Sequence, residues 1–270
     1  QFYRNDLQRI MLIPFIKMHA QGNDFVILDA FAFPLPELDF PTLAIDVCKP
    51  HTGIGADGLV ILSPCPQADA RMIIFNADGT RAEMCGSALR CVSFLMHQKL
   101  SLDSLSILTD SGVKLASISS QNGDIAVNMG IPRISKKGYP AEGFIGDLVD
   151  IGNLHYVVWQ DDVSSQPHIK YGSMLEMHSG FPQPVNVHFA RVINTHEIEI
   201  KIWERACGAT LACGTGATSC VFSGISNGSL QAPVKVNMPG GFVHVELNEK
   251  AYILIGTVTT AFTGEYLWKT

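Results

Sequence analysis

The sequence has no cluster of basic residues and no long apolar run. Lys and Arg together number 19, against 25 Asp and Glu in 270 residues, and the formal net charge is −6. Nucleic acid and anionic membrane are therefore excluded as favoured partners. No apolar segment approaches the length that spans a bilayer, and the first residues lack the pattern of a signal peptide. We expect a cytoplasmic globular enzyme that acts on a small molecule.

Closely spaced cysteine pairs are also missing, although the chain has seven cysteines. An odd number without a secretory signal argues against a disulfide framework. Structural zinc sites usually contain Cys-x2-4-Cys pairs, whereas the nearest cysteines here have five or six residues between them. No lysine stands in a recognisable pyridoxal-phosphate context. The sequence thus predicts no metal and no cofactor, and four thiols are interpreted as small buried hydrophobes: Cys48, Cys65, Cys91 and Cys220.

The only dinucleotide-type glycine pattern lacks the context that such a site needs. Gly53-Ile-Gly-Ala-Asp-Gly58 fits Gly-x-Gly-x-x-Gly, but the strand-like segment Leu59–Leu62 follows it. A dinucleotide site requires a helix at that point. Nucleotide binding is therefore not expected here.

What the chain does contain is one motif used twice. Asn76 stands nine positions before Cys85-Gly86, and Glu204 stands nine positions before Cys213-Gly214. Both members are displaced by the same 128 positions, from 76 to 204 and from 85 to 213. A gene duplication explains this register without insertions, and the chain length suits two halves of about 130 residues.

The surroundings of the two motifs predict the same local structure. Apolar β-type segments precede them at Arg71–Phe75 and Ile198–Trp203, and proline-free helical patterns follow at 87–100 and 215–227. We therefore expect an α/β fold of the α+β type, with two similar domains. The cleft between duplicated halves is the natural place for an active site.

Cys85 and Cys213 occupy the predicted turns just before these helices. The positive end of a helix dipole and the free backbone N–H groups there stabilise a thiolate and lower its pKa. The same N–H groups form an anion site that suits a substrate carboxylate. With one thiol on each side of a carbon, one cysteine could remove the α-proton while the other delivers a proton to the opposite face.

Seven sequence blocks resemble the signature blocks of the diaminopimelate epimerase family. They occur in the family's order: Lys17–Val26, Gly53–Leu59, Phe75–Gly79, Met84–Gly86, Gly152-Asn153 with His155, Asn186–Phe189, and Glu204-Arg205 through Ala212–Ala217. The resemblance implies a cofactor-independent isomerase that interconverts LL- and meso-diaminopimelate for lysine and peptidoglycan precursor synthesis. It also implies two domains, each a mainly antiparallel sheet wrapped around a central helix. The expected halves are residues 11–127, completed by about 258–270, and residues 128–257, and homodimers are common in the family.

The resemblance also implies a set of site residues. Cys85 and Cys213 match the catalytic cysteines, and His155 and Glu204 match residues that tune thiol pKa values. The implied substrate-binding residues are Asn23, Asn76, Gly86, Ser87, Asn153, Asn186, Glu204, Arg205, Gly214 and Thr215. Independently, a substrate with two amino-carboxylate ends needs a cation such as Arg205 and acceptors such as Glu204.

Several positions depart from the family's pattern. Ser87 replaces an Asn, and Ala88 replaces a Gly and favours a helix that starts slightly earlier. Leu154 replaces a Pro and Tyr156 a common Cys, which predicts a less rigid loop near His155. These changes leave the substrate range and the rate open.

Other functions remain to be weighed against the epimerase. A racemase of the same fold could act on proline, hydroxyproline or histidine, but Arg205, Asn153 and Asn186 favour a substrate with a charged distal end. A dithiol oxidoreductase is disfavoured because Cys85 and Cys213 form no Cys-x-x-Cys motif. A noncatalytic carboxylate-binding protein would need neither cysteine.

Overall fold

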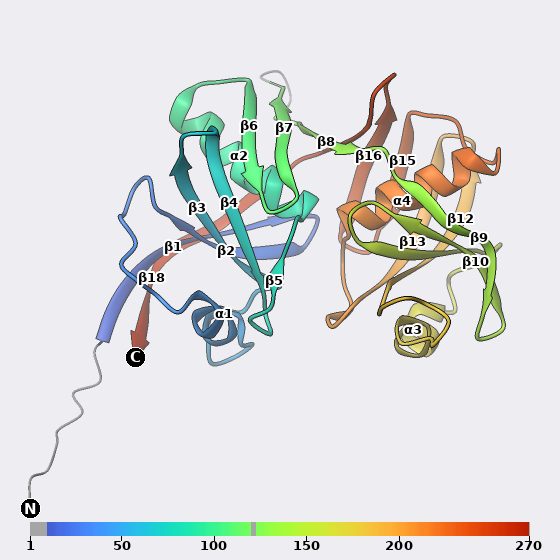
Figure 1. Cartoon of the computed structure of the whole chain (residues 1–270), viewed down its shortest axis with the longest axis horizontal. Helices are drawn as coiled ribbons and strands as arrows, with labels where there is room; N and C mark the ends of the chain where they lie inside the picture. The colour runs from blue at the N-terminus through green and yellow to red at the C-terminus, as the bar shows by residue number, and fades with distance from the viewer. Residues whose placement is uncertain (1–9, 120–122, 270) are drawn as a thin grey trace, which may run out of the picture.

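The computed structural model describes residues 10–119 and 123–269, which form two lobes side by side (Figure 1). The N-terminal residues 1–9, interpreted above for signals, lie outside the described residues. The first lobe contains β1 (Ile10–Ala20), β2 (Asn23–Asp29), α1 (Phe40–Cys48), β3 (Gly58–Cys65), β4 (Ala68–Asn76), β5 (Arg81–Ala82), α2 (Gly86–Leu100), β6 (Ser104–Thr109), β7 (Gly112–Ile118) and β8 (Ile125–Gly130).

The second lobe repeats this order of elements. It contains β9 (Arg133–Ala141), β10 (Phe144–Asp150), β11 (Leu154–Trp159), α3 (Pro167–Glu176), β12 (Asn186–Asn194), β13 (Glu197–Glu204), β14 (Gly208–Ala209), α4 (Gly214–Ser226), β15 (Val234–Met238), β16 (Gly241–Leu247) and β17 (Tyr252–Gly256). The chain then returns to the first lobe as β18 (Thr259–Lys269).

The strand pairing shows the same topology in both lobes. The first sheet runs β18-β1-β2-β3-β4-β6-β7-β8, and the second runs β9-β10-β11-β12-β13-β15-β16-β17. Parallel pairs occur at equivalent places, β2 with β3 and β4 with β6, then β11 with β12 and β13 with β15. The remaining pairs are antiparallel, as expected for the α+β fold of two similar halves.

The two sheets are joined where the chain crosses between the lobes. β8 pairs antiparallel with β17, and β18 pairs with β1 over ten register partners. The predicted boundary between residues 127 and 128 falls inside β8, and the one between 257 and 258 falls just before β18. Both boundaries stay predictions, while the return of the C-terminal strand to the first sheet is observed.

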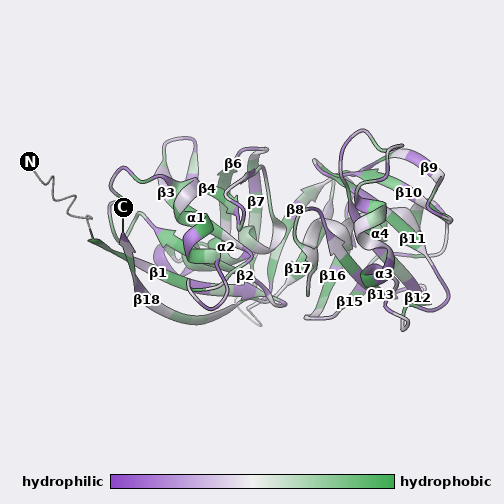
Figure 2. Cartoon of the chain, turned by 90° about the horizontal axis from the view of Figure 1, so that it is seen from below, coloured by the Kyte–Doolittle hydropathy of each residue, from purple (hydrophilic) through white to green (hydrophobic). Residues whose placement is uncertain are grey.

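One helix occupies the centre of each lobe because it is apolar on most sides. α2 buries ten of its 15 residues, and α4 buries ten of its 13. Both helices belong to a buried cluster that includes Val92 and Met96 of α2, Val221 of α4, and strand residues such as Ile27 and Ile200. Along strands such as β8 and β13 buried residues alternate with more exposed ones (Figure 2), whereas β2 and β3 are apolar on both faces because α2 covers one face and α1 the other.

The two central helices start at equivalent residues, Gly86 and Gly214. Ala88, which is completely buried, therefore gives α2 no earlier start than α4. In the described part of the chain, no helix combines the length and the apolarity that a membrane crossing requires.

Candidate active site

The two sequence motifs meet where α2 and α4 begin. Cys85 and Cys213 are the N-cap residues, with nearly the same extended backbone, φ −142° for both and ψ 120° and 110°. The helix ends face each other closely, since a Cβ atom built on Gly214 would lie 3.6 Å from the Cα atom of Gly86. Leu254 of β17 packs against both glycines. The duplicated cysteines are thus brought to one place between the lobes.

The Cys213 thiol is enclosed by polar groups. Its sulfur accepts a hydrogen bond from the Gly216 N–H at 3.4 Å and lies 3.5 Å from the Thr215 hydroxyl. The Glu204 carboxyl group also acts on the thiol and raises its pKa. Cys213 is only 2 % exposed, whereas Cys85 is partly exposed.

Burial reverses the expected direction of both thiol pKa values. Removal from water raises the pKa of Cys85 to about 11 and raises the pKa of Cys213 well above its usual value. Backbone N–H groups at the helix starts act in the predicted downward direction, but more weakly. The negative charge of Glu204 adds to the rise at both thiols. The helix starts therefore lower both thiol pKa values as predicted, but burial outweighs them, and the net shift in the free protein is upward.

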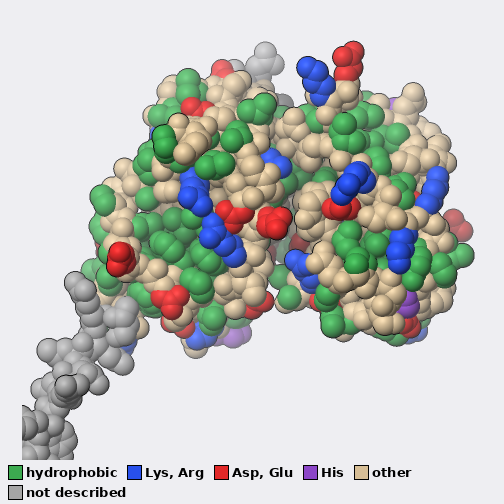
Figure 3. All heavy atoms as spheres, in the orientation of Figure 1, with side chains coloured by type: hydrophobic (Ala, Val, Ile, Leu, Met, Phe, Trp, Pro, Cys, Tyr) green, Lys and Arg blue, Asp and Glu red, His purple; other side chains and the backbone are tan. Residues whose placement is uncertain are grey.

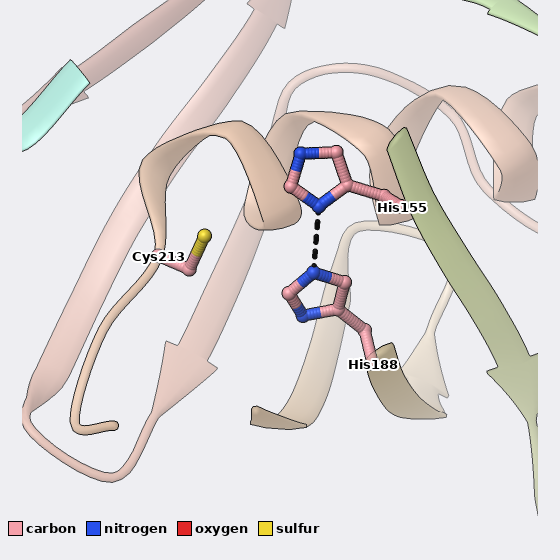
Figure 4. A group of neighbouring side chains, drawn as sticks. All are labelled: His155, His188 and Cys213. Carbon is pink, nitrogen blue, oxygen red and sulfur yellow. Dashed lines mark hydrogen bonds between the residues drawn. The ribbon is translucent and has the colours of Figure 1, made fainter. Parts of the chain in front are cut away.

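A chain of hydrogen bonds runs from Asn153 through two histidines, and Figure 4 shows the bond between His155 and His188. The Asn153 Oδ1 atom lies 2.9 Å from Nε2 of His155, and Nδ1 of His155 lies 2.8 Å from Nε2 of His188. An amide oxygen only accepts, so His155 donates to it from Nε2, and the neutral His155 accepts at Nδ1 from the His188 N–H. Nδ1 of His188 is then an unprotonated acceptor without a hydrogen-bond partner among the described residues.

Both histidines are neutral. They are completely buried, and burial lowers the pKa of His188 to about 3 and that of His155 well below its usual value. The positive charge of Arg205 lowers the pKa of His155 further. The resemblance did not assign a role to His188. Its spacing of two residues from the predicted Asn186 was the available sequence signal. The structure places it on the strand beside His155.

The remaining predicted residues of the second lobe surround Cys213. The Glu204 carboxylate accepts a hydrogen bond from the Thr210 hydroxyl at 2.6 Å, and burial raises its pKa. The Asn186 side chain donates to the Leu154 carbonyl and accepts from the Arg205 N–H. The Arg205 side chain is exposed.

The predicted residues of the first lobe are placed differently. Asn76 ends β4 and donates to the Thr80 hydroxyl at 2.9 Å. Asn23 is buried and donates to the Ala212 carbonyl at 3.3 Å, so it contacts the other lobe directly beside Cys213. Ser87 is buried at the start of α2, and its hydroxyl has no hydrogen-bond partner among the described residues.

Figure 3 shows a furrow between the two lobes, with acidic and basic side chains on both walls. The family model for diaminopimelate epimerase matches residues 15–135 and 148–261. The chain belongs to the diaminopimelate epimerase family. A diaminopimelate epimerase of Pelotomaculum thermopropionicum is 36 % identical over 95 % of this chain and 99 % of its own. One of Halothermothrix orenii is 38 % identical, over 94 % of this chain and 98 % of its own.

Solved structures share the fold at low sequence identity. A phenazine biosynthesis protein of the PhzF family from Bacillus anthracis superposes with a TM-score of 0.76 at 15 % identity, over 96 % of this chain and 100 % of its own. A hydroxyproline epimerase from Agrobacterium vitis also gives 0.76, at 14 % identity, over 96 % of this chain and 92 % of its own. Two-lobed architecture is thus common to the diaminopimelate epimerase family and these proteins.

Two departures from the diaminopimelate epimerase pattern now have a structural setting. Leu154 and Tyr156 are buried, and the Tyr156 hydroxyl donates to the Tyr139 carbonyl at 2.7 Å. These contacts anchor the segment for which the sequence predicts a less rigid loop. Gly216, the counterpart of Ala88, lies against the His188 ring, where a Cβ atom would approach Cε1 to 2.1 Å. In the first lobe Val60 occupies the place equivalent to His188. The smaller valine leaves room for the methyl group of Ala88, whereas the histidine ring leaves none at position 216.

Proposed function

We propose that this protein interconverts LL- and meso-diaminopimelate through Cys85 and Cys213, without a cofactor. The observation that carries the proposal is the head-to-head contact of two helix starts, each with a cysteine as its N-cap. One thiolate removes the α-proton, and the pair of electrons left on carbon is stabilised by the adjoining carboxylate. The opposite thiol donates its proton to the other face, so the two cysteines exchange protonation states in each turnover.

The resting protonation states follow from the partners of the two thiols. Cys213 is almost completely buried, and burial together with the nearby Glu204 charge raises its pKa, so we take Cys213 as the resting thiol. Cys85 is partly exposed, and removal from water raises its pKa to about 11. We assign Cys85 as the first base and Cys213 as the first acid. The α-ammonium of the substrate, placed beside Cys85, lowers its pKa on binding.

The helix starts supply the carboxylate site. The N–H groups of Gly86, Ser87, Gly214 and Thr215 belong to two first turns, where backbone donors have no partner within the helix. A substrate carboxylate between them neutralises the positive ends of both helix dipoles. It also delocalises the negative charge that develops on the α-carbon as the carbanion forms. The unpartnered Ser87 hydroxyl adds one donor at this point.

The other end of the substrate meets the groups that surround Cys213. Arg205 offers an exposed guanidinium for the distal carboxylate, and Asn76, Asn153 and Asn186 offer amide groups for polar atoms. His155 and Glu204 act on the Cys213 thiol through charge and hydrogen bonding. Asn23 reaches the substrate only after it leaves the Ala212 carbonyl, so its role requires the lobes to shift.

Access to the site differs between the two thiols. The β1–β2 turn of the first lobe covers the Cys213 loop, since Gly22 packs on Leu211 and the Gln21 carbonyl adjoins Gly240. Surface hollows of 420 and 370 Å³ lie over β6–β8 and over β7, β8 and β16, and neither includes a cysteine. The turn thus shields Cys213, and we propose that the substrate reaches it when the lobes separate.

Two wider aspects belong to the same proposal. All seven cysteines are free thiols, which suits the reducing cytoplasm. A homodimer is supported by an apolar surface on the outer strands, where the register partners Leu12 and Leu267 are 51 % and 59 % exposed. Light scattering of Leu12→Lys beside the unchanged protein tests the dimer, and an unchanged mass would exclude this surface.

The reaction is tested by isotope exchange. The reduced protein is incubated with LL-diaminopimelate in deuterated water, and mass spectrometry and chiral chromatography follow the α-carbon. We expect one deuterium per inversion and formation of the meso isomer. Proline, hydroxyproline and histidine are tested in parallel, and exchange in one of them alone would replace diaminopimelate with that substrate.

Single cysteine variants separate the two bases. Cys85→Ser and Cys213→Ser should each lose epimerisation by at least about a thousandfold, because a serine hydroxyl is a far weaker acid than a thiol. Cys91→Ser is the matched control, since this buried thiol lies on α2 but away from its start. Near-normal turnover in either of the first two variants would overturn the two-base mechanism.

A further inference from the structure

His155, His188 and Cys213 form a compact group of metal-type ligands at the closed end of the site. Their ligand atoms all lie within 4.8 Å of one another, and all three side chains are buried (Figure 4). Cysteine spacing along the chain predicts no zinc site, because that argument considers cysteine pairs alone. The fold instead brings one cysteine to two histidines from neighbouring strands β11 and β12.

We propose that this group is an inhibitory binding site for Zn²⁺ or a similar soft divalent cation. Two imidazoles and one thiolate are a ligand set that such ions prefer, and a tetrahedral ion would keep a fourth position for water. The bound ion holds the Cys213 sulfur and so removes it from proton transfer. The inhibitory effect rests on the proposed reaction, whereas metal binding is measured without substrate, so failure of the site is distinguishable from failure of the reaction.

The ion binds between the two histidines and replaces the hydrogen bond that joins them. Nδ1 of His155 and Nε2 of His188 are 2.8 Å apart with one proton between them. Two nitrogens on a zinc ion, at bonds of about 2.0–2.1 Å, stand about 3.3 Å apart, so the rings need to separate by about half an ångström. The proton moves to Nδ1 of His188, which has no hydrogen-bond partner among the described residues. The sulfur lies within 4.8 Å of both nitrogens and moves by up to about 1.2 Å to reach the sulfur–nitrogen separation of about 3.6 Å on a tetrahedral zinc ion.

The protonation states favour the ion. Both imidazoles are already neutral, so neither has to lose a proton to the solvent before it binds. Cys213 releases its proton as the sulfur–metal bond forms, and one proton per ion therefore appears in solution. Asn153 accepts from Nε2 of His155 at 2.9 Å, which is the outer hydrogen bond that orients a metal-binding imidazole.

The first lobe provides matched controls, because it has no histidines at the places equivalent to His155 and His188. Phe25 pairs with Gly58 where His155 pairs with Asn186, and Val60 stands two residues after Gly58, as His188 stands two after Asn186. Cys85 therefore has no such ligand group. The substitutions His155→Phe and His188→Val copy the residues that the same fold already accommodates, and both Phe25 and Val60 are buried.

Calorimetry and Co²⁺ absorption test the site with the metal ion alone. The reduced protein should bind one Zn²⁺ and release one proton, and Co²⁺ should give a thiolate-to-metal charge-transfer band. Cys213→Ser should abolish the band, and His155→Phe and His188→Val should each weaken Zn²⁺ binding by at least about tenfold. Asn153→Ala should weaken it by about tenfold through the lost outer hydrogen bond.

Cys85→Ser decides between this site and other thiols. It should keep the full Zn²⁺ affinity and the charge-transfer band. The proposal is overturned if Zn²⁺ binding survives in Cys213→Ser or is lost in Cys85→Ser. A thermal melt of each variant shows whether it is folded. If the histidine variants do not fold, the comparison of Cys213→Ser with Cys85→Ser still shows whether Zn²⁺ binds at the proposed site.

Discussion

Gly86 and Gly214 lie against each other where the two central helices begin, with the Cα atom of Gly86 3.6 Å from the Cβ position of Gly214. The two lobes thus touch at the backbone of the residues that follow the two cysteines. A methyl group at position 214 would be in ordinary contact with the Gly86 backbone, and its crowding would fall on Leu254. The contact fixes the distance over which a single carbon could meet both Cys85 and Cys213.

Gly214→Ala is predicted to be more harmful than Gly86→Ala. The new methyl group would lie 2.8 Å from a Leu254 methyl at position 214, but 3.2 Å from it at position 86. We expect Gly214→Ala to lower the free energy of unfolding by about 1–3 kcal/mol, as overpacking does, and Gly86→Ala to lower it by less. Urea unfolding and epimerase assays of both variants measure the difference.

A second substitution shows whether crowding is the cause. Leu254→Ala destabilises the protein by itself, because it leaves a cavity. Combined with Gly214→Ala it should cost less than the sum of the two changes, since it removes the crowding neighbour. Strict additivity would mean that the methyl group acts through something other than Leu254.

Arg90 is predicted to support the Cys85 thiolate. It is completely buried, and its two hydrogen bonds, to the Gly86 and Thr257 carbonyls, are long at 3.4 and 3.5 Å. Among the described residues no carboxylate forms an ion pair with it, and its positive charge lowers the pKa of Cys85. Burial lowers the pKa of Arg90 itself to about 10, so it is charged at neutral pH.

Arg90→Met should therefore raise the pKa of Cys85 above its present value of about 11. Alkylation of Cys85 by iodoacetamide, followed by peptide mass spectrometry, should be slower by about tenfold at pH 8 if the pKa rises by about one unit. Arg90→Lys keeps the charge and should change the rate less. Because removal of an unpaired buried charge is not costly, the thermal midpoint of Arg90→Met should not fall sharply. Equal alkylation rates would exclude an electrostatic role.

Oxidation is predicted to join Cys85 to Cys213. Both are N-cap residues of helices whose first residues are in contact, so their sulfurs converge on one small space. Mass spectrometry of the oxidised, unreduced protein should find a peptide that contains both residues, and activity should return with a reductant. Cys207, which is exposed, is replaced by serine beforehand, so that links between molecules do not obscure the result. Oxidised protein with both thiols still free would contradict the prediction.

The repeated motif made the fold predictable, because both copies show a strand, a turn and a helix in the same order and at the same spacing. The expected helix at 87–100 differs from α2 by one residue at its start, and the expected helix at 215–227 differs from α4 by one residue at each end. Local sequence sets these elements, and their apolar spacing is visible in the chain. The return of β18 to β1 came from the family resemblance, since a pairing across the whole chain has no local signal.

The thiol environment could not be predicted in the same way. The sequence shows that Cys85 and Cys213 precede helices, which gives the direction of the dipole effect. It does not show how much water the other lobe excludes, and this exclusion is the larger effect on both pKa values. His188 was missed for a similar reason. Its bond to His155 depends on the parallel pairing of β11 with β12, which is not visible in the residues alone.

Leu211 is predicted to control access to Cys213. It is 52 % exposed, yet it packs on Gly22 of the β1–β2 turn, next to the hydrogen bond from Asn23 to the Ala212 carbonyl. Leu211→Ala removes the side chain that the turn rests on. The turn should then leave the Cys213 loop more often, because among the described residues only polar contacts, such as the Asn23 hydrogen bond and the Gln21 side-chain bond to the Thr257 carbonyl, remain to hold it. Alkylation of Cys213 should become several-fold faster while that of Cys85 in the same molecule stays constant, so Cys85 is the internal control. Equal acceleration at both cysteines would instead mean general loosening of the lobes, and no acceleration at either would mean that reagents reach Cys213 by another path.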